Sequence, residues 1–169
     1  MQALNVQVPF AVGRELLEGQ LGNDIAAHLR EIPTDVELGS RGGRELVDER
    51  GHADQAWRLL NNRNENTGIG WVIAGKLLAR KRPTFIASYD SIVSCQFGAP
   101  NQVWLKLSSQ LVDNGGELRT TLVDARATAC ADDEVSILRA LDAVLRRRHV
   151  RQHRRDNPLA CPQRRSLTV

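Results

Sequence analysis

Two glycines and two basic residues form the stretch of this chain best suited to binding an anion. Gly68 and Gly70 flank one isoleucine just before a segment with helical periodicity, in which Lys76 and Arg80 follow. Glycine permits positive φ and lets a ligand approach the backbone closely. The first N–H groups of the following helix are unpaired and carry the positive end of its dipole. The spacing therefore predicts an anion site that suits a DNA phosphate.

Asp90 is the acid that could act beside this turn. It follows Gly70 by twenty positions and directly precedes the segment 91–97, which has helical character. An aspartate there is either a helix N-cap or, in an enzyme that removes bases from DNA, a charge that stabilises an oxocarbenium-like transition state. The second role requires the target base to leave the stack. Both roles fit one residue.

The elements that position these residues are predicted to be helices. Aromatic residues make up only 4% of the chain, and its apolar content is mostly Ala, Leu and Val, which favours helices over a β-sandwich. Apolar spacing indicates about seven or eight short helices in an all-α, orthogonal bundle. They are expected over residues 12–17, 24–30, 53–60, 71–82, 91–97, 102–111 and 118–129. The last helix is expected to have inward apolar residues from Val135 to Leu145 and to hold Arg146–Arg148 at the negative end of its dipole.

Caps and breaks set the expected ends of these helices. Asn23 is the predicted N-cap of the second helix, and Asp132 or Asp133 that of the last. A turn is expected at 114–116, and residues 61–66, which include no apolar side chain, are expected to be a linker into the glycine turn. In the helix after that turn, Val72, Ile73 and Leu77 are expected to face the core, with Ala74 as a fourth candidate.

The charge of the chain is uneven. The formal net charge is +3, yet the residues from Ala143 onward hold eight arginines and one acid, Asp156, so the rest of the chain is mildly acidic. We therefore expect a helical domain over 1–150 and a basic, disordered tail over 151–169. Such a tail either binds an acidic partner, nucleic acid first, or is merely solvated.

Several classes of protein are disfavoured. The three cysteines, Cys95, Cys130 and Cys161, include no C-x-x-C pair, so no zinc ribbon or iron–sulfur cluster is expected. His149 and His153 are four apart but lie among arginines, so we expect no metal site and no cofactor. No apolar run approaches the length of a membrane span and no signal peptide is visible, so the expected place is the cytoplasm, without a membrane partner.

The run Thr67-Gly68-Ile69-Gly70, with Asp90-Ser91-Ile92-Val93 after it, resembles the helix-hairpin-helix DNA glycosylase superfamily. The resemblance covers about residues 60–97. It implies a hairpin that binds the backbone of double-stranded DNA, with Asp90 at the catalytic position of a monofunctional enzyme. The nucleic-acid contacts it implies are Gly68, Gly70, Trp71, Lys76 and Arg80. For Trp71, core packing is the alternative role.

The departures from that superfamily narrow the chemistry. Val72 stands where its bifunctional members carry a nucleophilic lysine, so Schiff-base lyase chemistry is not expected. Asn66-Thr67 replaces the Leu-Pro that precedes the hairpin, and the four-cysteine cluster of some members is absent from the sequence. The chain also resembles an uncharacterised actinobacterial family through residues 31–35 and 75–83, a likeness that brings no activity with it.

Three functions therefore stay open at this point. The first is a DNA-binding helix-hairpin-helix protein with base-excision activity, and the second is a non-catalytic DNA-binding module. The third is a helical protein-interaction domain in which the glycine turn is only structural. The sequence indicates no particular lesion and no oligomeric state.

Overall fold

A computed structural model describes residues 7–40, 42–48, 50–61, 68–98, 100–129 and 135–155. All regular structure in these residues is helical, which confirms the all-α prediction. The helices are α1 Phe10–Glu18, α2 Gln20–Arg30, α3 Gly43–Val47, α4 His52–Leu60, α5 Trp71–Lys81, α6 Ser91–Phe97, α7 Pro100–Thr128 and α8 Ile137–Arg155.

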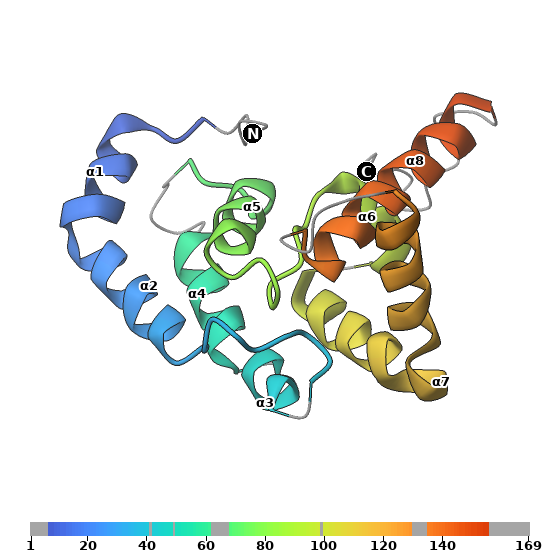
Figure 1. The fold of residues 1–169 in the computed structure, drawn as a ribbon. Coiled ribbons are helices and arrows are strands. Elements are labelled where there is room, and N and C mark those ends of the chain that lie inside the picture. Colours follow the sequence, from blue (N-terminus) through green and yellow to red (C-terminus); the bar gives the residue numbers. More distant parts are fainter. Residues whose placement is uncertain are drawn as a thin grey trace.

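The helices form two groups that share one core. In the first, α2 packs on α1 and α4, and α4 packs on α5; in the second, α6, α7 and α8 pack on one another (Figure 1). The short α3 touches both groups, through α4 and α7. A continuous apolar cluster runs through both, with Ile32, Leu78, Phe85 and Leu107 almost fully buried.

The segment between α5 and α6 crosses this core and carries the chain to Asp90. Phe85, Ile86 and Ala87 are buried along it. Its polar groups are paired on the way: Thr84 donates from Oγ1 to the Val36 carbonyl, and the Trp104 indole donates to the Ala87 carbonyl at 3.0 Å. A buried segment with its backbone satisfied in this manner is a rigid support for the residue that follows it.

Arg82 links the start of the same segment to the end of α2. Its Nε donates to the Ile32 carbonyl at 2.8 Å and its Nη2 to the Leu29 carbonyl at 2.5 Å. Both carbonyls lie at or just past the end of α2, where helix carbonyls have fewer backbone partners, and the Leu29 carbonyl also accepts from the Ile32 N–H at 3.3 Å. A guanidinium there satisfies them and also opposes the negative end of the helix dipole.

Some expected helix boundaries differ from the observed ones, and one expected cap lies outside the described residues. The helix α2 begins at Gln20 with Gly19 as its N-cap, not at Asn23, because Gly22 allows a tight corner: a Cβ there would lie 2.1 Å from the Leu16 carbonyl oxygen. Asp132 and Asp133 lie outside the described residues, and α8 begins just after Ser136, whose Oγ accepts from the Arg139 N–H.

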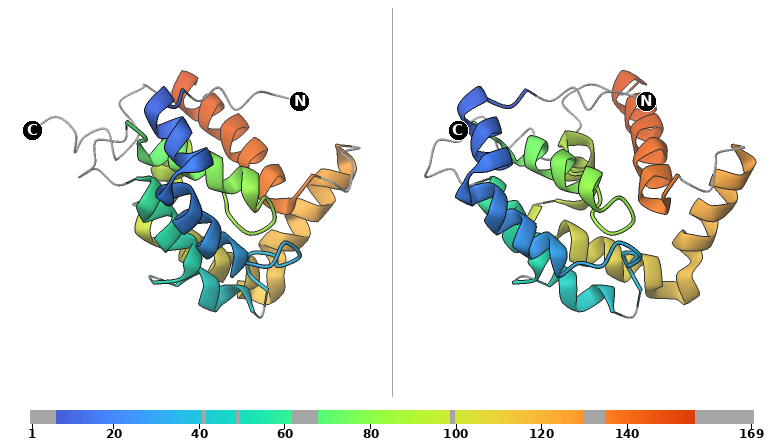
Figure 2. Two further views of the ribbon diagram at one scale, coloured as in Figure 1. Left: turned by 90° about the vertical axis from the view of Figure 1, so that its left-hand side faces the viewer. Right: turned by 60° about the vertical axis from the view of Figure 1, so that its left-hand side comes forward.

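The third difference is in α7, which is one element from Pro100 to Thr128 where two helices were expected. The expected turn is nevertheless visible within it. Gly115 and Gly116 have φ of 68° and 80°, and the helix changes direction sharply about midway (right-hand view of Figure 2). Consecutive glycines in the left-handed region account for this bend.

The expected boundary between domain and tail at residue 150 falls inside a helix. The helix α8 continues through Arg155, and the remaining expected tail, residues 156–169, lies outside the described residues.

Candidate nucleic-acid interface

The glycine turn before α5 presents its backbone outward. Gly68 has a φ of 67°, in the left-handed region that favours glycine. Ile69 is 4% exposed and anchors the turn in the core, whereas Gly68 and Gly70 on either side of it are exposed. The alternation of exposed, buried and exposed residues leaves the two glycine backbones as the outer surface of the turn.

The local structure excludes other residues at position 68 but not at position 70. A Cβ at Gly68 would lie 2.9 Å from Cγ of Pro9, in addition to the strain of the positive φ. Gly70 has an ordinary extended conformation, with φ −80° and ψ 168°, and a Cβ there would meet nothing within 4 Å. The fold itself therefore explains a glycine at position 68 but does not require one at position 70.

The first turn of α5 keeps its N–H groups available. Gly70 is the N-cap, and no side chain accepts from the amides that follow it. The helical hydrogen bonds begin with the Ala74 N–H donating to the Gly70 carbonyl at 3.0 Å. The N–H groups before Ala74 thus have no acceptor within the helix, and they lie at the positive end of its dipole.

Lys76 and Arg80 lie farther along α5 than the turn. They are one helical turn apart on the side away from Ala74, Gly75 and Leu78, which form the buried face. Lys76 is half-buried and Arg80 is exposed. At 1.5 Å per residue, Arg80 lies roughly 13 Å along the helix axis from Trp71. The two cations therefore extend the surface that begins at the turn; they do not surround the turn itself.

Trp71 joins the start of α5 to the residue before Asp90. Its ring lies 5.0 Å from the Tyr89 ring, tilted by 58°, and Trp71 itself is half-buried. Tyr89 is buried, and its hydroxyl donates to the Gly98 carbonyl at 2.7 Å at the end of α6. Trp71 therefore has the packing role that was weighed against DNA contact, and it keeps a partly exposed surface.

The helix α5 approaches this segment closely at Gly75. A Cβ there would lie 3.1 Å from both the backbone N and O of Tyr89. The expected core face of α5 is confirmed in part: Ala74 is buried, and Ile73 and Leu77 pack against the core, but the fully buried face also includes Gly75 and Leu78.

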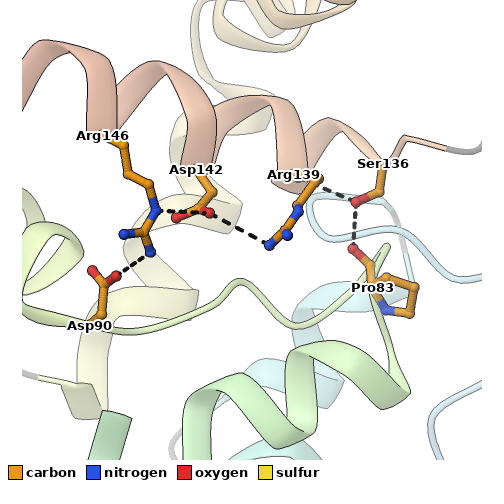
Figure 3. Close-up of polar contacts among 6 residues, drawn as sticks. All are labelled: Pro83, Asp90, Ser136, Arg139, Asp142 and Arg146. Atoms are coloured by element: carbon orange, nitrogen blue, oxygen red, sulfur yellow. Dashed lines mark hydrogen bonds and ion pairs between the residues drawn. The ribbon is translucent and has the colours of Figure 1, made fainter. Parts of the chain in front are cut away.

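Asp90 is a buried N-cap with both carboxylate oxygens in use. The residue is 6% exposed, and its Oδ1 accepts from the backbone N–H groups of Ile92 at 2.9 Å and Val93 at 3.1 Å. Its Oδ2 accepts from Nη2 of Arg146 at 2.5 Å (Figure 3). The N-cap role expected for Asp90 is thus confirmed, and the expected helix at 91–97 forms with those bounds.

Arg146 connects Asp90 to α8, and sequence reasoning did not find this contact. Its Nε also donates to Oδ2 of Asp142 at 3.3 Å, and Asp142 lies 3.6 Å from Nη1 of Arg139 (Figure 3). Burial alone would lower the pKa of the Arg146 guanidinium, but Asp142 and Asp90 raise it, and the net direction is upward. Arg146 therefore carries a full positive charge beside the Asp90 carboxylate. The four-residue spacing of Asp142 and Arg146 was the one local signal of this network.

His28 and His52, which have no partner close in sequence, meet in the fold. Their Nδ1 atoms are 3.3 Å apart and their ring centroids 5.6 Å apart, across α2 and α4. Among the residues that the structure describes, no group of three or more His, Cys, Asp or Glu could hold a metal ion. The side chain of His153, one half of the histidine pair weighed in the sequence, lies outside what is described.

Two hollows lie elsewhere on the molecule. One of about 470 Å³ is lined by Arg50, Asp54, Gln55 and Arg58. Another of about 230 Å³ lies between α7 and the start of α8, with Glu37, Arg119 and Arg126 among its lining residues. Neither is lined by Asp90 or the glycine turn, so neither is a base pocket for this carboxylate.

None of the described helices has the combination of length and apolar character that crossing a bilayer requires. No curated protein and no solved structure matches the chain. A family model does match: that of a family of unknown function, DUF6308, over residues 1–149, which is most of the chain. The chain is therefore a member of the DUF6308 family.

Proposed function

We propose that this protein is a non-catalytic DNA-binding module that holds a backbone phosphate of double-stranded DNA at the Gly68–Gly70 turn. The observation that carries the proposal is Gly70. It is exposed, its dihedral angles suit any residue, and no protein atom would meet its Cβ. At the exposed start of a helix, such a glycine leaves the backbone open to the close approach of a ligand.

A phosphate is the ligand that suits this surface. The first N–H groups of α5 point out of the helix end at its positive pole, and no side chain caps them. An anion there satisfies donors that otherwise depend on water. Lys76 and Arg80, farther along the same helix, would add contacts to neighbouring phosphates that carry no sequence information.

Asp90 favours the module over the enzyme. Both of its oxygens are engaged, by two backbone amides and by Arg146, and the residue is buried. A carboxylate that stabilises a sugar cation must present an oxygen to that sugar. Base excision is the second candidate, favoured by the Trp71–Tyr89 contact that brings Asp90 beside the start of α5. It would require Arg146 to leave Asp90 first.

Gly70→Asp separates binding from folding, because the two properties should change in opposite directions. Aspartate is a preferred N-cap and an acid in the first turn favours the helix dipole, so α5 should become about 0.5–1 kcal/mol more stable. The same carboxylate would occupy the amides and repel a phosphate, so duplex affinity should fall at least tenfold. Fluorescence anisotropy with a 20-base-pair duplex and urea unfolding measure the two effects.

Gly42→Asp is the matched control. Gly42 is exposed, a Cβ there meets nothing within 4 Å, and the substitution adds the same charge. Equal losses of affinity in both variants would mean that general charge, and not the turn, decides binding. If the unaltered protein does not bind the duplex at low salt, both DNA-binding functions are excluded, and a protein-interaction domain is the function that remains.

A further inference from the structure

The helix α8 continues beyond its described contacts with the core. The core-facing stripe of the helix consists of Ile137, Leu138, Leu141 and Leu145, and it ends there. The helix continues for ten residues, 146–155, and projects beyond α6 and α7 (Figure 1). We call these ten residues the α8 arm. Arg146, Arg147 and Arg148, which follow the stripe, are exposed, so these three residues of the arm are available at the surface.

The α8 arm is basic throughout its length. It contains six arginines and two histidines and no acid. The first of these, Arg146, turns back to Asp90 and Asp142, and Asp142 also pairs with Arg139. The carboxylates at the root of the arm are thus already used. Arg147 and Arg148 are exposed, and no carboxylate among the described residues pairs with either of them.

We infer that the α8 arm is a second nucleic-acid contact, which lies along the phosphate backbone of the duplex that the proposed function places on α5. The inference rests on that proposed function. Besides Arg146, the arm carries five arginines over about 12 Å of helix, which suits a polymer that carries one charge per roughly 1.7 Å of duplex. Arginine also pairs bidentately with phosphate, which a point-charge lysine cannot do.

A membrane surface fits the arm less well than nucleic acid. A helix that lies in a bilayer interface needs a broad apolar face opposite its basic face. Val150 is the sole large apolar residue between 146 and 155. The arm therefore offers charge without the apolar area that would hold it in lipid.

Asp90 holds the first residue of the α8 arm. Its pair with Arg146 joins the root of the arm to the start of α6, so the direction in which the arm leaves the body is fixed by a buried carboxylate. Asp90 is a positioning residue for the arm.

The test is the double variant Arg147→Gln with Arg148→Gln in the full chain, in the same 20-base-pair duplex assay from 50 to 300 mM salt. Each lost phosphate contact should lower the slope of log affinity against log salt by about one, so the slope should fall by about two. Affinity at 150 mM salt should fall roughly tenfold or more. Arg14→Gln with Arg30→Gln, two exposed arginines on α1 and α2, is the matched control and should change the slope little.

The outcomes separate this inference from the proposed function. If the arm variant keeps the full slope while Gly70→Asp weakens binding, the arm inference is overturned and the turn stands. If the arm variant loses slope while Gly70→Asp binds normally, the arm is the interface and the turn is not. Binding to phosphatidylserine vesicles that depends on Arg147 and Arg148, with no binding to the duplex, would overturn both in favour of lipid.

Discussion

Asp90 and Arg146 lie 56 positions apart in the chain and meet at 2.5 Å in the fold. One oxygen of the carboxylate caps α6 and the other holds α8, so a single side chain fixes the direction of two helices. The Asp90 side chain is 9% exposed and that of Arg146 is 44% exposed. The carboxylate of this ion pair is therefore buried and the guanidinium is near solvent. Losing the pair should cost the buried carboxylate more, because water can solvate the guanidinium in its place.

Replacing Asp90 should separate its two structural roles. Asparagine caps a helix about as well as aspartate, so Asp90→Asn should lose mainly the pair with Arg146, at roughly 1 kcal/mol given the exposure of the guanidinium. Asp90→Ala should also lose the cap, for a total of roughly 2–3 kcal/mol. Urea unfolding of Asp90→Asn, Arg146→Met and the double variant should show a coupling of at least 0.5 kcal/mol. Strict additivity would mean that the pair contributes nothing.

The two contacts of Asp90 differ in how far a sequence can predict them. Aspartate before an apolar run predicts a cap, because the partners of the side chain are the next two or three amides. The contact with Arg146 depends on how α8 lies across α6, and no local pattern contains that orientation. The arginines at 146–148 were consistent with a helix C-terminus facing the dipole, whereas the helix in fact runs on to Arg155.

The buried face of α5 was predicted only in part, for a related reason. Periodicity gives weight to large apolar residues, and it therefore selected Val72, Ile73 and Leu77 first and Ala74 only as a fourth candidate. The fully buried residues are Ala74, Gly75 and Leu78, and at Gly75 the helix approaches the Tyr89 backbone too closely for a larger side chain. The presence of a helix can be predicted from the composition of its sequence. Which side of the helix is buried depends on the shape of the segment that it packs against.

Gly75→Ala tests this close approach. The added methyl would lie 3.1 Å from the backbone N and O of Tyr89, so the variant should lose about 1–3 kcal/mol of unfolding free energy even though alanine favours a helix. Gly13→Ala in α1 is the matched control, because a Cβ there meets nothing within 4 Å; it should gain up to about 1 kcal/mol. Thermal and urea unfolding measure both. A stabilised Gly75→Ala would show that α5 and Tyr89 are not in contact.

Base release is the measurement that decides between the two DNA-binding functions. With both oxygens of Asp90 engaged, we expect no free base from a panel of lesion-bearing duplexes at any pH between 5 and 9 under conditions in which the protein is bound. Chromatography of the released bases and alkaline cleavage of abasic sites provide the readout. Release that disappears in Asp90→Asn, at protein concentrations that saturate the duplex with either protein, would establish the enzyme.

Tyr89 gives an optical measure of the same junction, since it is the one tyrosine in the chain. Burial raises its pKa above 10.0, a hydrogen bond with Ser94 lowers it, and the charge of Asp90 raises it, with a net upward shift. The folded state therefore favours the neutral phenol. The stability that results is present below the unfolded pKa of about 10 and is lost as the pH rises through the folded value.

The tyrosinate absorbance of the native protein should thus titrate above pH 10, and that of the urea-unfolded protein near 10. Asp90→Asn should bring the native midpoint down, because it removes the neighbouring negative charge that disfavours the phenolate. Tyr89→Phe should abolish the signal and flatten the alkaline decline in unfolding free energy relative to the unaltered protein. A native midpoint at or below 10 would mean that the Tyr89 phenol is open to solvent and that the packing of Trp71, Tyr89 and Asp90 between α5 and α6 is not formed.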